Sequence, residues 1–334
     1  MTTDHEATAE DRLIARHFRP LAKHAGAFGL VDDAAVITPP PGHDVVLKTD
    51  AIIGGVHFFP DDPPDSIARK ALRVNLSDLA AKGARPAGFL LSLALPKGLG
   101  DAWLAAFADG LGADAERYAC PLLGGDTDRT PGPVMVSIAA FGTLPHATMV
   151  MRSGAQVGDR IVVTGTIGDG ALGVMLREQP DTRARWKLDQ RMADHLIGRY
   201  LVPEPRNAIA DVLRRYASAA MDVSDGLMGD LTKLCRASGV TAEIESARVP
   251  VSEAAACALA AEPSLIEQIL TGGDDYEVLA TVAPDRVETL RLEAAAVGVP
   301  VTEIGHVVAG KGEPRFIDRD GRRLMFKRLS FSHF

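Results

Sequence analysis

Residues 270–279, LTGGDDYEVL, place two glycines and two adjacent carboxylates directly before the apolar run 278–280. Glycine and aspartate favour a turn, and the apolar run favours a buried strand. Such acidic junctions recur, and apolar runs alternate with amphipathic stretches along the chain. We therefore predict an α/β protein with carboxylates at the ends of several strands. The other junctions are LVDDAAVI (30–37), VVLKTDAII (45–53), PLLGGDTD (121–128) and AAMDVSDGL (219–227).

The length of the chain, 334 residues, suggests two domains. A polar, turn-rich stretch, MRSGAQVGDR at 151–160, is followed by a new apolar run. We place the boundary there, which gives an N-terminal domain of residues 1–150 and a C-terminal domain of residues 151–334. The formal net charge of −8 argues against a nucleic-acid or anionic-membrane surface.

The cysteines and the apolar content indicate the compartment. Cys120, Cys235 and Cys257 form no CxxC pair and are odd in number, which favours a reducing compartment with the thiols as core residues. The acidic N-terminus MTTDHEATAEDR is unlike a signal peptide. No uninterrupted apolar stretch reaches the roughly 20 residues of a membrane helix. We therefore expect a soluble cytoplasmic protein without a membrane partner.

Hydrophobic periodicity locates the secondary structure coarsely. We expect helices over 64–82, 101–118, 169–178, 205–217, 226–238 and 285–297. We expect strands over 43–52, 87–96, 134–144, 159–165, 219–223 and 276–282.

Asp78 lies on the apolar stripe of its expected helix, at about 100° per residue. A carboxylate there either lies at the rim of the face and caps a neighbouring loop, or points inward at a metal ion, because buried carboxylates need partners. The stripe consists of Ile67, Ala71, Val74 and Asp78, and the opposite side of Arg69, Lys70, Arg73 and Ser77.

Three further carboxylates follow apolar runs. Asp225 precedes a helical pattern and could be a turn residue or helix cap, whereas Asp222 ends a strand. Asp126 follows two glycines, which let backbone approach a ligand closely. Clustered carboxylates repel one another unless a cation compensates, and Mg²⁺ typically bridges such oxygens to substrate phosphates. Together the junctions favour metal-dependent nucleotide chemistry.

Two glycine-rich stretches resemble nucleotide-binding motifs. GHVVAGKG (305–312) has Gly312 where a P-loop needs Ser or Thr, and it leads into an expected hairpin. VVTGTIGDGALGVML (162–176) has the spacing GxxGxG instead of GxGxxG. We reject the first as a P-loop and interpret the second as a helix start that assists phosphate binding or domain packing. His57, in GGVHFF, either packs beside its aromatic neighbours or presents its imidazole to a ligand.

In chain order, eight segments resemble those of the thiamine-monophosphate kinase family, which is related to aminoimidazole-ribonucleotide synthetase. NLSD with AAKG, GGDT and SDGL at these relative positions form a specific set, and the resemblance covers nearly the whole chain. The segments are VDDAAVI (31–37), KTDAIIGGVHF (48–58), KALRVNLSDLAAKGARP (70–86), LLGGDTDR (122–129), RSGAQVGD (152–159), VTGTIGDGALG (163–173), MDVSDGL (221–227) and GGDDYEV (272–278).

The resemblance implies a homodimer of two-domain α/β subunits with mixed sheets. It also implies ATP-dependent phosphorylation of thiamine monophosphate with several Mg²⁺ ions, in a cleft between the domains. No side chain is expected to act as a general base. The residues implied as metal ligands are Asp33, Thr49, Asp50, Asp78, Asp126, Asp222 and Asp225. Those implied to contact ATP are Gly125, Asp126, Arg152 and Ser224, and those implied to hold thiamine phosphate are His57, Asp274 and Phe331.

Two positions depart from the family pattern. Asp274 replaces the usual Glu of GGEDYE, and Lys48 occupies the first position of the (S/T)TD pattern. Selenophosphate synthetases and hydrogenase-maturation proteins are alternatives, but they carry functional cysteines near the N-terminus and at the C-terminus, respectively. The amidine-forming purine enzymes lack the combination of GGVHF and GGDDYE. A non-enzymatic thiamine-phosphate or nucleotide binding protein would need a broken metal set.

Overall fold

The computed structural model describes residues 8–327 and 330. These residues form two compact units. The first comprises the chain up to Leu76 together with Pro86–Pro145, and the second comprises Ser77–Arg85 together with the chain from His146 onward. Helix α2 (Pro64–Ala81) therefore contributes its first part to one unit and its last turn to the other.

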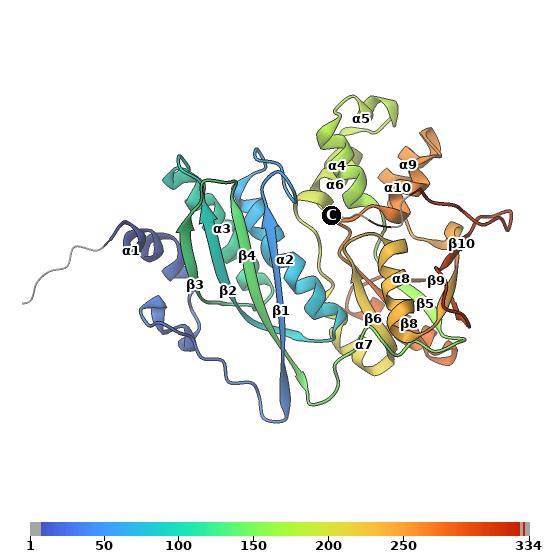
Figure 1. Cartoon of the computed structure of the whole chain (residues 1–334), viewed down its shortest axis with the longest axis horizontal. Helices are drawn as coiled ribbons and strands as arrows, with labels where there is room; N and C mark the ends of the chain where they lie inside the picture. Colours follow the sequence, from blue (N-terminus) through green and yellow to red (C-terminus); the bar gives the residue numbers. More distant parts are fainter. Residues whose placement is uncertain (1–7, 328–329, 331–334) are drawn as a thin grey trace, which may run out of the picture. The chain divides into compact units, whose positions relative to one another are not determined.

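The first unit contains a four-stranded mixed sheet in the order β1-β4-β2-β3 (Figure 1). The long antiparallel pair β1·β4 sets its frame, with Asp50 opposite Ile138. Along β4, every second residue from Val136 to Leu144 is buried, as expected for a sheet with one covered face. The strands are β1 (His43–Ile53), β2 (Arg85–Leu95), β3 (Leu122–Arg129) and β4 (Met135–Pro145).

Helices α2 and α3 (Asp101–Arg117) pack closely against each other in this unit. A Cβ on Gly110 of α3 would lie 2.4 Å from the carbonyl oxygen of Asp65, so the contact requires glycine. Arg73 of α2 donates to Asp114 of α3 at 2.5 and 2.9 Å, and both side chains are 2% exposed. The side of α2 opposite its apolar stripe is therefore buried as well, although its sequence is polar. A buried charge of this kind needs such a partner.

The second unit contains a six-stranded mixed sheet in the order β10-β7-β9-β5-β8-β6. Every neighbouring pair is antiparallel except the parallel pair β10·β7. The strands are β5 (Arg160–Thr164), β6 (Ala217–Val223), β7 (Thr241–Glu245), β8 (Glu277–Val282), β9 (Val301–Val308) and β10 (Arg315–Ile317).

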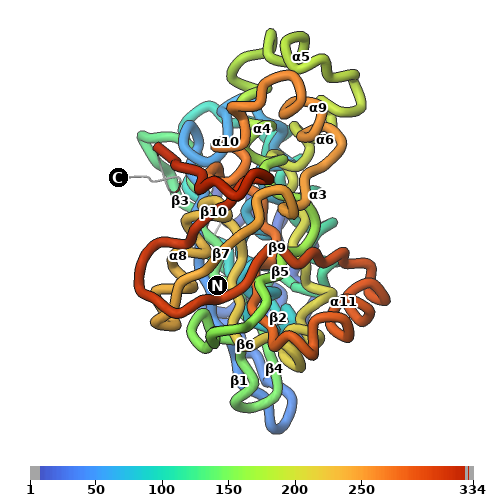
Figure 2. The backbone as a smooth tube through the Cα atoms, turned by 90° about the vertical axis from the view of Figure 1, so that its right-hand side faces the viewer, coloured from blue at the N-terminus to red at the C-terminus, as the bar shows by residue number. Residues whose placement is uncertain are grey.

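Two hydrophobic clusters lie on opposite faces of this sheet. Ile161 and Val163 of β5 belong to one cluster, and Val162 between them belongs to the other. Because both faces are covered, the central strands are continuous apolar runs. Figure 2 shows α8 and α11 on different sides of the strands. The first cluster includes residues of α4, α6, α8, α9 and α10, and the second includes residues of α7 and α11.

The expected elements are largely present. Five of the six expected helices match observed ones closely, but 205–217 contains a short 3₁₀ turn before α7. No helix was predicted for α1, α5, α6, α9 or α10, and no strand for β3, β7 or β9. As expected, residues 313–323 form no helix, and Ile317 bridges Arg323. The helices beyond α2 and α3 are α1 (Ala9–Leu13), α4 (Asp169–Glu178), α5 (Thr182–Arg185), α6 (Gln190–Leu201), α7 (Ala210–Tyr216), α8 (Leu227–Ser238), α9 (Glu253–Ala261), α10 (Leu265–Thr271) and α11 (Val287–Ala296).

Two of the three thiols are core residues. Cys120 and Cys235 are buried, and burial raises the pKa of each to about 12. Cys257 is only partly buried, which departs from the expectation for all three. Over residues 8–327 and 330, no helix has both the length and the hydropathy needed to cross a membrane.

Candidate active site

In the second unit, the end of β6 presents Asp222 beside the last turn of α2. The Ser77 hydroxyl donates to Oδ2 of Asp222 at 2.8 Å, and Asp222 is 5% exposed. Asp78, the next residue along α2, is partly exposed, whereas its neighbours at 70–77 and 79–81 are buried. The structure thus brings together two predicted metal ligands, one from a helix and one from a strand, within the same unit.

The loop after β6 is held by the fully buried carboxylate of Asp230. The backbone amides of Ser224 and Asp225 each donate to Oδ2 of Asp230 at 2.9 Å. Burial raises the pKa of Asp230, and Lys233, whose Nζ lies 2.8 Å from Oδ1, opposes that rise. Lys233 also pairs with the predicted metal ligand Asp225. The loop is therefore fixed through its backbone, and the Asp225 carboxylate has an internal counterion.

Arg152 is exposed, on a segment that is anchored through its main chain. The hydroxyl of Ser238 accepts from the amides of Gly154 and Ala155, each at 3.2 Å. Gly154 has a φ of 127°, and a Cβ there would lie 2.4 Å from the carbonyl oxygen of Ser218. This glycine allows the segment to lie directly against β6, and the Arg152 side chain projects from a fixed backbone.

The GGDDYE loop that leads into β8 divides its acidic residues between two environments. Asp274 is partly exposed, whereas Asp275 and Glu277 are fully buried. Of the three carboxylates, only that of Asp274 is accessible to solvent, and the other two bind the protein itself.

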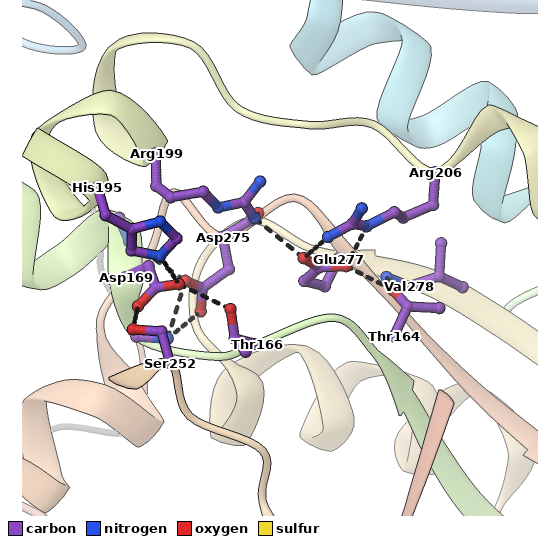
Figure 3. Close-up of polar contacts among 12 residues, drawn as sticks. Thr164, Thr166, Asp169, His195, Arg199, Arg206, Ser252, Asp275, Glu277 and Val278 are labelled. Carbon is purple, nitrogen blue, oxygen red and sulfur yellow. Dashed lines mark hydrogen bonds and ion pairs between the residues drawn. The ribbon is translucent and has the colours of Figure 1, made fainter. Parts of the chain in front are cut away.

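Another buried carboxylate, Asp169, begins helix α4 beside this loop (Figure 3). It accepts hydrogen bonds from Ser252 at 2.5 Å and Thr166 at 2.7 Å, and His195 Nε2 lies 3.0 Å away. Burial alone would raise the pKa of Asp169, but these three hydrogen bonds outweigh it and lower the pKa. Serine and histidine both contact the carboxylate instead of each other, so this is no Ser-His-Asp triad.

In the first unit, Asp33, Gly125 and Asp126 line one cavity of about 870 Å³. Its wall consists of the segment before β1 and the strands of the sheet, including Val45 and Leu47 of β1. Gly125 has a packing reason to be glycine, because a Cβ there would lie 1.9 Å from the carbonyl oxygen of Leu91. Gly125 and Asp126 are both exposed where they line this cavity.

The remaining predicted residues of this unit lie on β1 and just after it. Thr49 is exposed, and Asp50 forms an ion pair with Lys48 at 3.1 Å. Nδ1 of His57 accepts from the Ile53 amide at 3.1 Å, which places the proton of a neutral imidazole on Nε2. Lys70 donates to the His57 carbonyl oxygen at 3.0 Å. His57 therefore has a fixed ring that can donate a hydrogen bond.

Over the part of the chain that the structure describes, no three His, Cys, Asp or Glu side chains gather in a geometry that could hold a metal ion. The predicted ligands nevertheless supply only carboxylate and hydroxyl oxygens, the donors that Mg²⁺ prefers. Phe331 lies outside the described residues.

Sequence reasoning gave no role to four residues that organise the second unit, namely Arg199, Arg206, Asp230 and Asp275. Arg199 and Arg206 pair with Glu277, and Asp275 accepts from the amide of Gly168. A carboxylate at the first position of a fully buried strand requires cations, and this signal could have prompted a search for the arginines. Asp230, which follows SDGL by three residues, carries no local signal of its role, because its partners are backbone amides.

Comparison with known proteins defines the class. Residues 31–144 match the N-terminal domain of AIR synthase related proteins, and residues 156–317 match the C-terminal domain of the same group. A thiamine-monophosphate kinase of Caulobacter vibrioides is 41% identical over 96% of this chain and 89% of its own length. The chain belongs to the thiamine-monophosphate kinase family within the AIR synthase related proteins.

Solved structures agree with this assignment. The thiamine-monophosphate kinase of Stenotrophomonas maltophilia has a TM-score of 0.81 and 36% identity, over 94% of this chain and 96% of that one. The structure of AaThiL complexed with AMPPCP and TMP has a TM-score of 0.77 and 30% identity, over 92% and 97%. The resemblance inferred from the sequence motifs and the predicted fold class are therefore confirmed.

Proposed function

We propose that the protein transfers the γ-phosphoryl group of ATP to thiamine monophosphate, giving ADP and thiamine diphosphate. The observation that carries this function is the near full-length similarity to kinases of this name, one of them solved with AMPPCP and TMP. An oxygen of the acceptor phosphate forms the new bond to the γ-phosphorus, and the bond to the β–γ bridging oxygen breaks. The displaced electron pair leaves on ADP.

This reaction needs no general base. The acceptor is a phosphate oxygen that is already ionised near neutral pH, so no proton has to be removed before attack. The protein must hold two mutually repelling anions in line and neutralise their charge. The fixed ring of His57, which carries its proton on Nε2, fits a hydrogen-bond donor to the acceptor phosphate better than a base.

The proposed residues divide by what they bind. Bound Mg²⁺ supplies charge neutralisation between the two phosphate groups. The exposed backbone at Gly125, the anchored Arg152 and the fixed loop at Ser224 suit nucleotide phosphates. Asp274 and His57 suit the acceptor, together with Phe331. We propose as Mg²⁺ ligands Asp33, Thr49, Asp50, Asp78, Asp126, Asp222 and Asp225, with Asp126 also at ATP.

We also infer that the protein is a homodimer that pairs through the open face of the first sheet. On β1 the alternate residues Val45 and Leu47 are 40% and 71% exposed, and Met135 on the neighbouring β4 is 36% exposed. Exposed apolar rows of this kind mark interaction surfaces. Light scattering should give twice the 35.4 kDa chain mass. Leu47→Glu should lower the measured mass to that of one chain. A monomeric wild type would contradict the inference.

A coupled assay of ADP release with purified protein, Mg²⁺ and candidate acceptors tests the function. Thiamine monophosphate should be turned over, and the same assay without it should release little ADP. Turnover of an aminoimidazole precursor or of selenide, with none of thiamine monophosphate, would refute the proposal. We place this activity in the cytoplasm, because a reducing compartment suits free cysteines such as Cys120 and Cys235.

A further inference from the structure

Glu277, the first residue of β8, lies at the centre of a buried ion-pair cluster (Figure 3). Arg206 donates to both of its oxygens, at 2.5 and 2.6 Å, and Arg199 donates to Oε1 at 2.9 Å. The Thr164 hydroxyl donates to Oε2 at 2.6 Å and accepts from the amide of Val278 at 2.7 Å. The carboxylate is therefore held from three sides, and two full cations share one anion.

The two arginines differ in a second contact. Nη2 of Arg199 also donates to the main-chain carbonyl oxygen of Asp275, at 3.0 Å. Arg199 thus joins the buried ion pair to the backbone of the GGDDYE loop, whereas Arg206 donates to both oxygens of the Glu277 carboxylate.

The side chain of Asp275 holds the same loop from the opposite direction. Both of its oxygens accept from the amide of Gly168 at 2.9 Å, just before helix α4. Full burial raises the pKa of Asp275 well above its ordinary range, and the Gly168 hydrogen bond opposes that rise. A Cβ on the neighbouring Gly170 would lie 2.3 Å from the carbonyl oxygen of Asp274. The start of α4 therefore lies in direct contact with the loop.

The loop needs such support because its backbone is strained. Asp274 and Tyr276 have φ values of 71° and 53°, in the left-handed region that L-residues avoid. Their amides donate to the carbonyl oxygens of Ser224 and Val223, at 2.9 and 2.8 Å. Strained residues persist only where their surroundings over-determine the conformation. Here the surroundings are the β6–α8 loop, the start of α4 and the Arg199–Glu277 pair.

We propose that Arg199 is a positioning residue for acceptor binding. It ties the Asp275 carbonyl to the buried Glu277, and this tie keeps Asp274 in the strained conformation that presents its carboxylate to thiamine monophosphate. The proposal rests on the proposed function for the identity of the acceptor. The positioning itself is a property of the loop and can be measured without any substrate.

The test compares Arg199→Gln with the matched control Arg206→Gln. Each variant removes one cation from Glu277 and leaves it the other arginine and Thr164. With Arg199→Gln, the KM for thiamine monophosphate should rise about ten-fold, the equivalent of one charge-assisted hydrogen bond. The KM for ATP should stay within about two-fold, and kcat within about three-fold, because no reacting atom is touched. Arg206→Gln should leave the KM for thiamine monophosphate within about three-fold.

Amide hydrogen exchange supplies the readout that is independent of activity. Arg199→Gln should speed exchange of the Asp274 and Tyr276 amides about ten-fold, and Arg206→Gln should not. Arg199→Lys retains a donor and should restore part of both effects; it also replaces Arg199→Gln if that variant fails to fold. Equal effects of the two glutamine variants on KM and exchange would overturn the positioning role. A wild type without turnover would instead refute the proposed function. The amide exchange rates of Asp274 and Tyr276 would then still test whether Arg199 positions the loop.

Discussion

The hydroxyl of Ser77 donates a 2.8 Å hydrogen bond to the carboxylate of Asp222, which joins the last turn of α2 to the end of β6. This contact links two segments separated by 145 positions in the sequence. It also orients the carboxylate of a predicted metal ligand. Asp78 follows Ser77 directly, so the same helix turn carries one predicted metal ligand and donates a hydrogen bond to the other.

Asp222→Asn and Asp78→Asn should each lower kcat by at least about a hundred-fold, as expected when one strong electrostatic contact to a transferred phosphoryl group is lost. The free energy of unfolding without Mg²⁺ should change by less than about 1 kcal/mol, because asparagine retains an acceptor for Ser77 and relieves repulsion. Steady-state kinetics and denaturant unfolding check both statements. Ser77→Ala, which keeps the Asp222 charge, is the control and should lower kcat by less than about ten-fold. Near-normal activity of Asp222→Asn at limiting Mg²⁺ would make this residue structural.

Lys233→Met should make Mg²⁺ more stabilising. Without Mg²⁺, the variant should lose at least about 1 kcal/mol of stability, because the ion pairs with Asp225 and with the fully buried Asp230 are both lost. The rise in Tm on adding Mg²⁺ should be larger than in the wild type, since Asp225 is no longer engaged by the lysine. Thermal unfolding across a Mg²⁺ titration measures this difference. Lys233→Arg keeps the cation and should behave as the wild type; an unchanged Mg²⁺ response in Lys233→Met would exclude Asp225 as a ligand.

Asp274→Gly and Asp274→Ala should separate backbone strain from ligand binding. Both should raise the KM for thiamine monophosphate, because both lack the carboxylate. Glycine adopts a φ of 71° without steric cost, whereas alanine there should lower the free energy of unfolding by about 1 kcal/mol. Asp274→Glu, which restores the common family residue, should keep the KM within about three-fold of the wild type. An unchanged KM in the glycine variant would remove Asp274 from the acceptor site.

His57→Asn should weaken acceptor binding and retain turnover. The asparagine oxygen can still accept from the Ile53 amide, so the local fold is preserved. The KM for thiamine monophosphate should rise about ten-fold, the cost of one hydrogen bond to a charged group, with kcat within about three-fold. A pH profile of kcat checks the role. If the variant loses an ionisation in the histidine range and about a thousand-fold in kcat, His57 is a base after all.

Asp275→Asn should flatten the dependence of stability on pH above the ordinary Asp pKa of 3.8. A raised pKa in the folded state gives stability that is fully present below 3.8 and is lost as pH rises through the raised value. The wild type should therefore lose up to about 1.4 kcal/mol per pH unit in this window that the variant does not lose. Denaturant unfolding at several pH values measures the difference in slope.

Asp169 provides the contrast for this experiment. Its pKa is lowered, so its contribution is present above 3.8 and is lost as pH falls through the lowered value. Asp169→Asn should therefore change the slope only on the acid side. Parallel curves for the wild type and Asp275→Asn above 3.8 would mean that Asp275 is ionised in the folded protein.

The sequence by itself determined the fold class, the family and most of the regular elements. Apolar runs and helical periodicity are local properties, so they located α2 and β8 within a residue or two. The acidic junctions pointed to the loops at Asp222 and Asp274, since glycine and aspartate at a strand end favour a turn through the conformation of the local backbone. These signals depend on neighbours along the chain.

Only the tertiary structure decided which acids are accessible to solvent and which are neutralised inside the protein. In GGDDYE three carboxylates look alike, yet Glu277 is neutralised by Arg199 and Arg206, which lie 78 and 71 positions away. Arg199 lies on α6, a helix that the sequence analysis missed altogether. The physical reason is that a buried charge is stable only with partners, and those partners are chosen by packing between segments far apart in the chain.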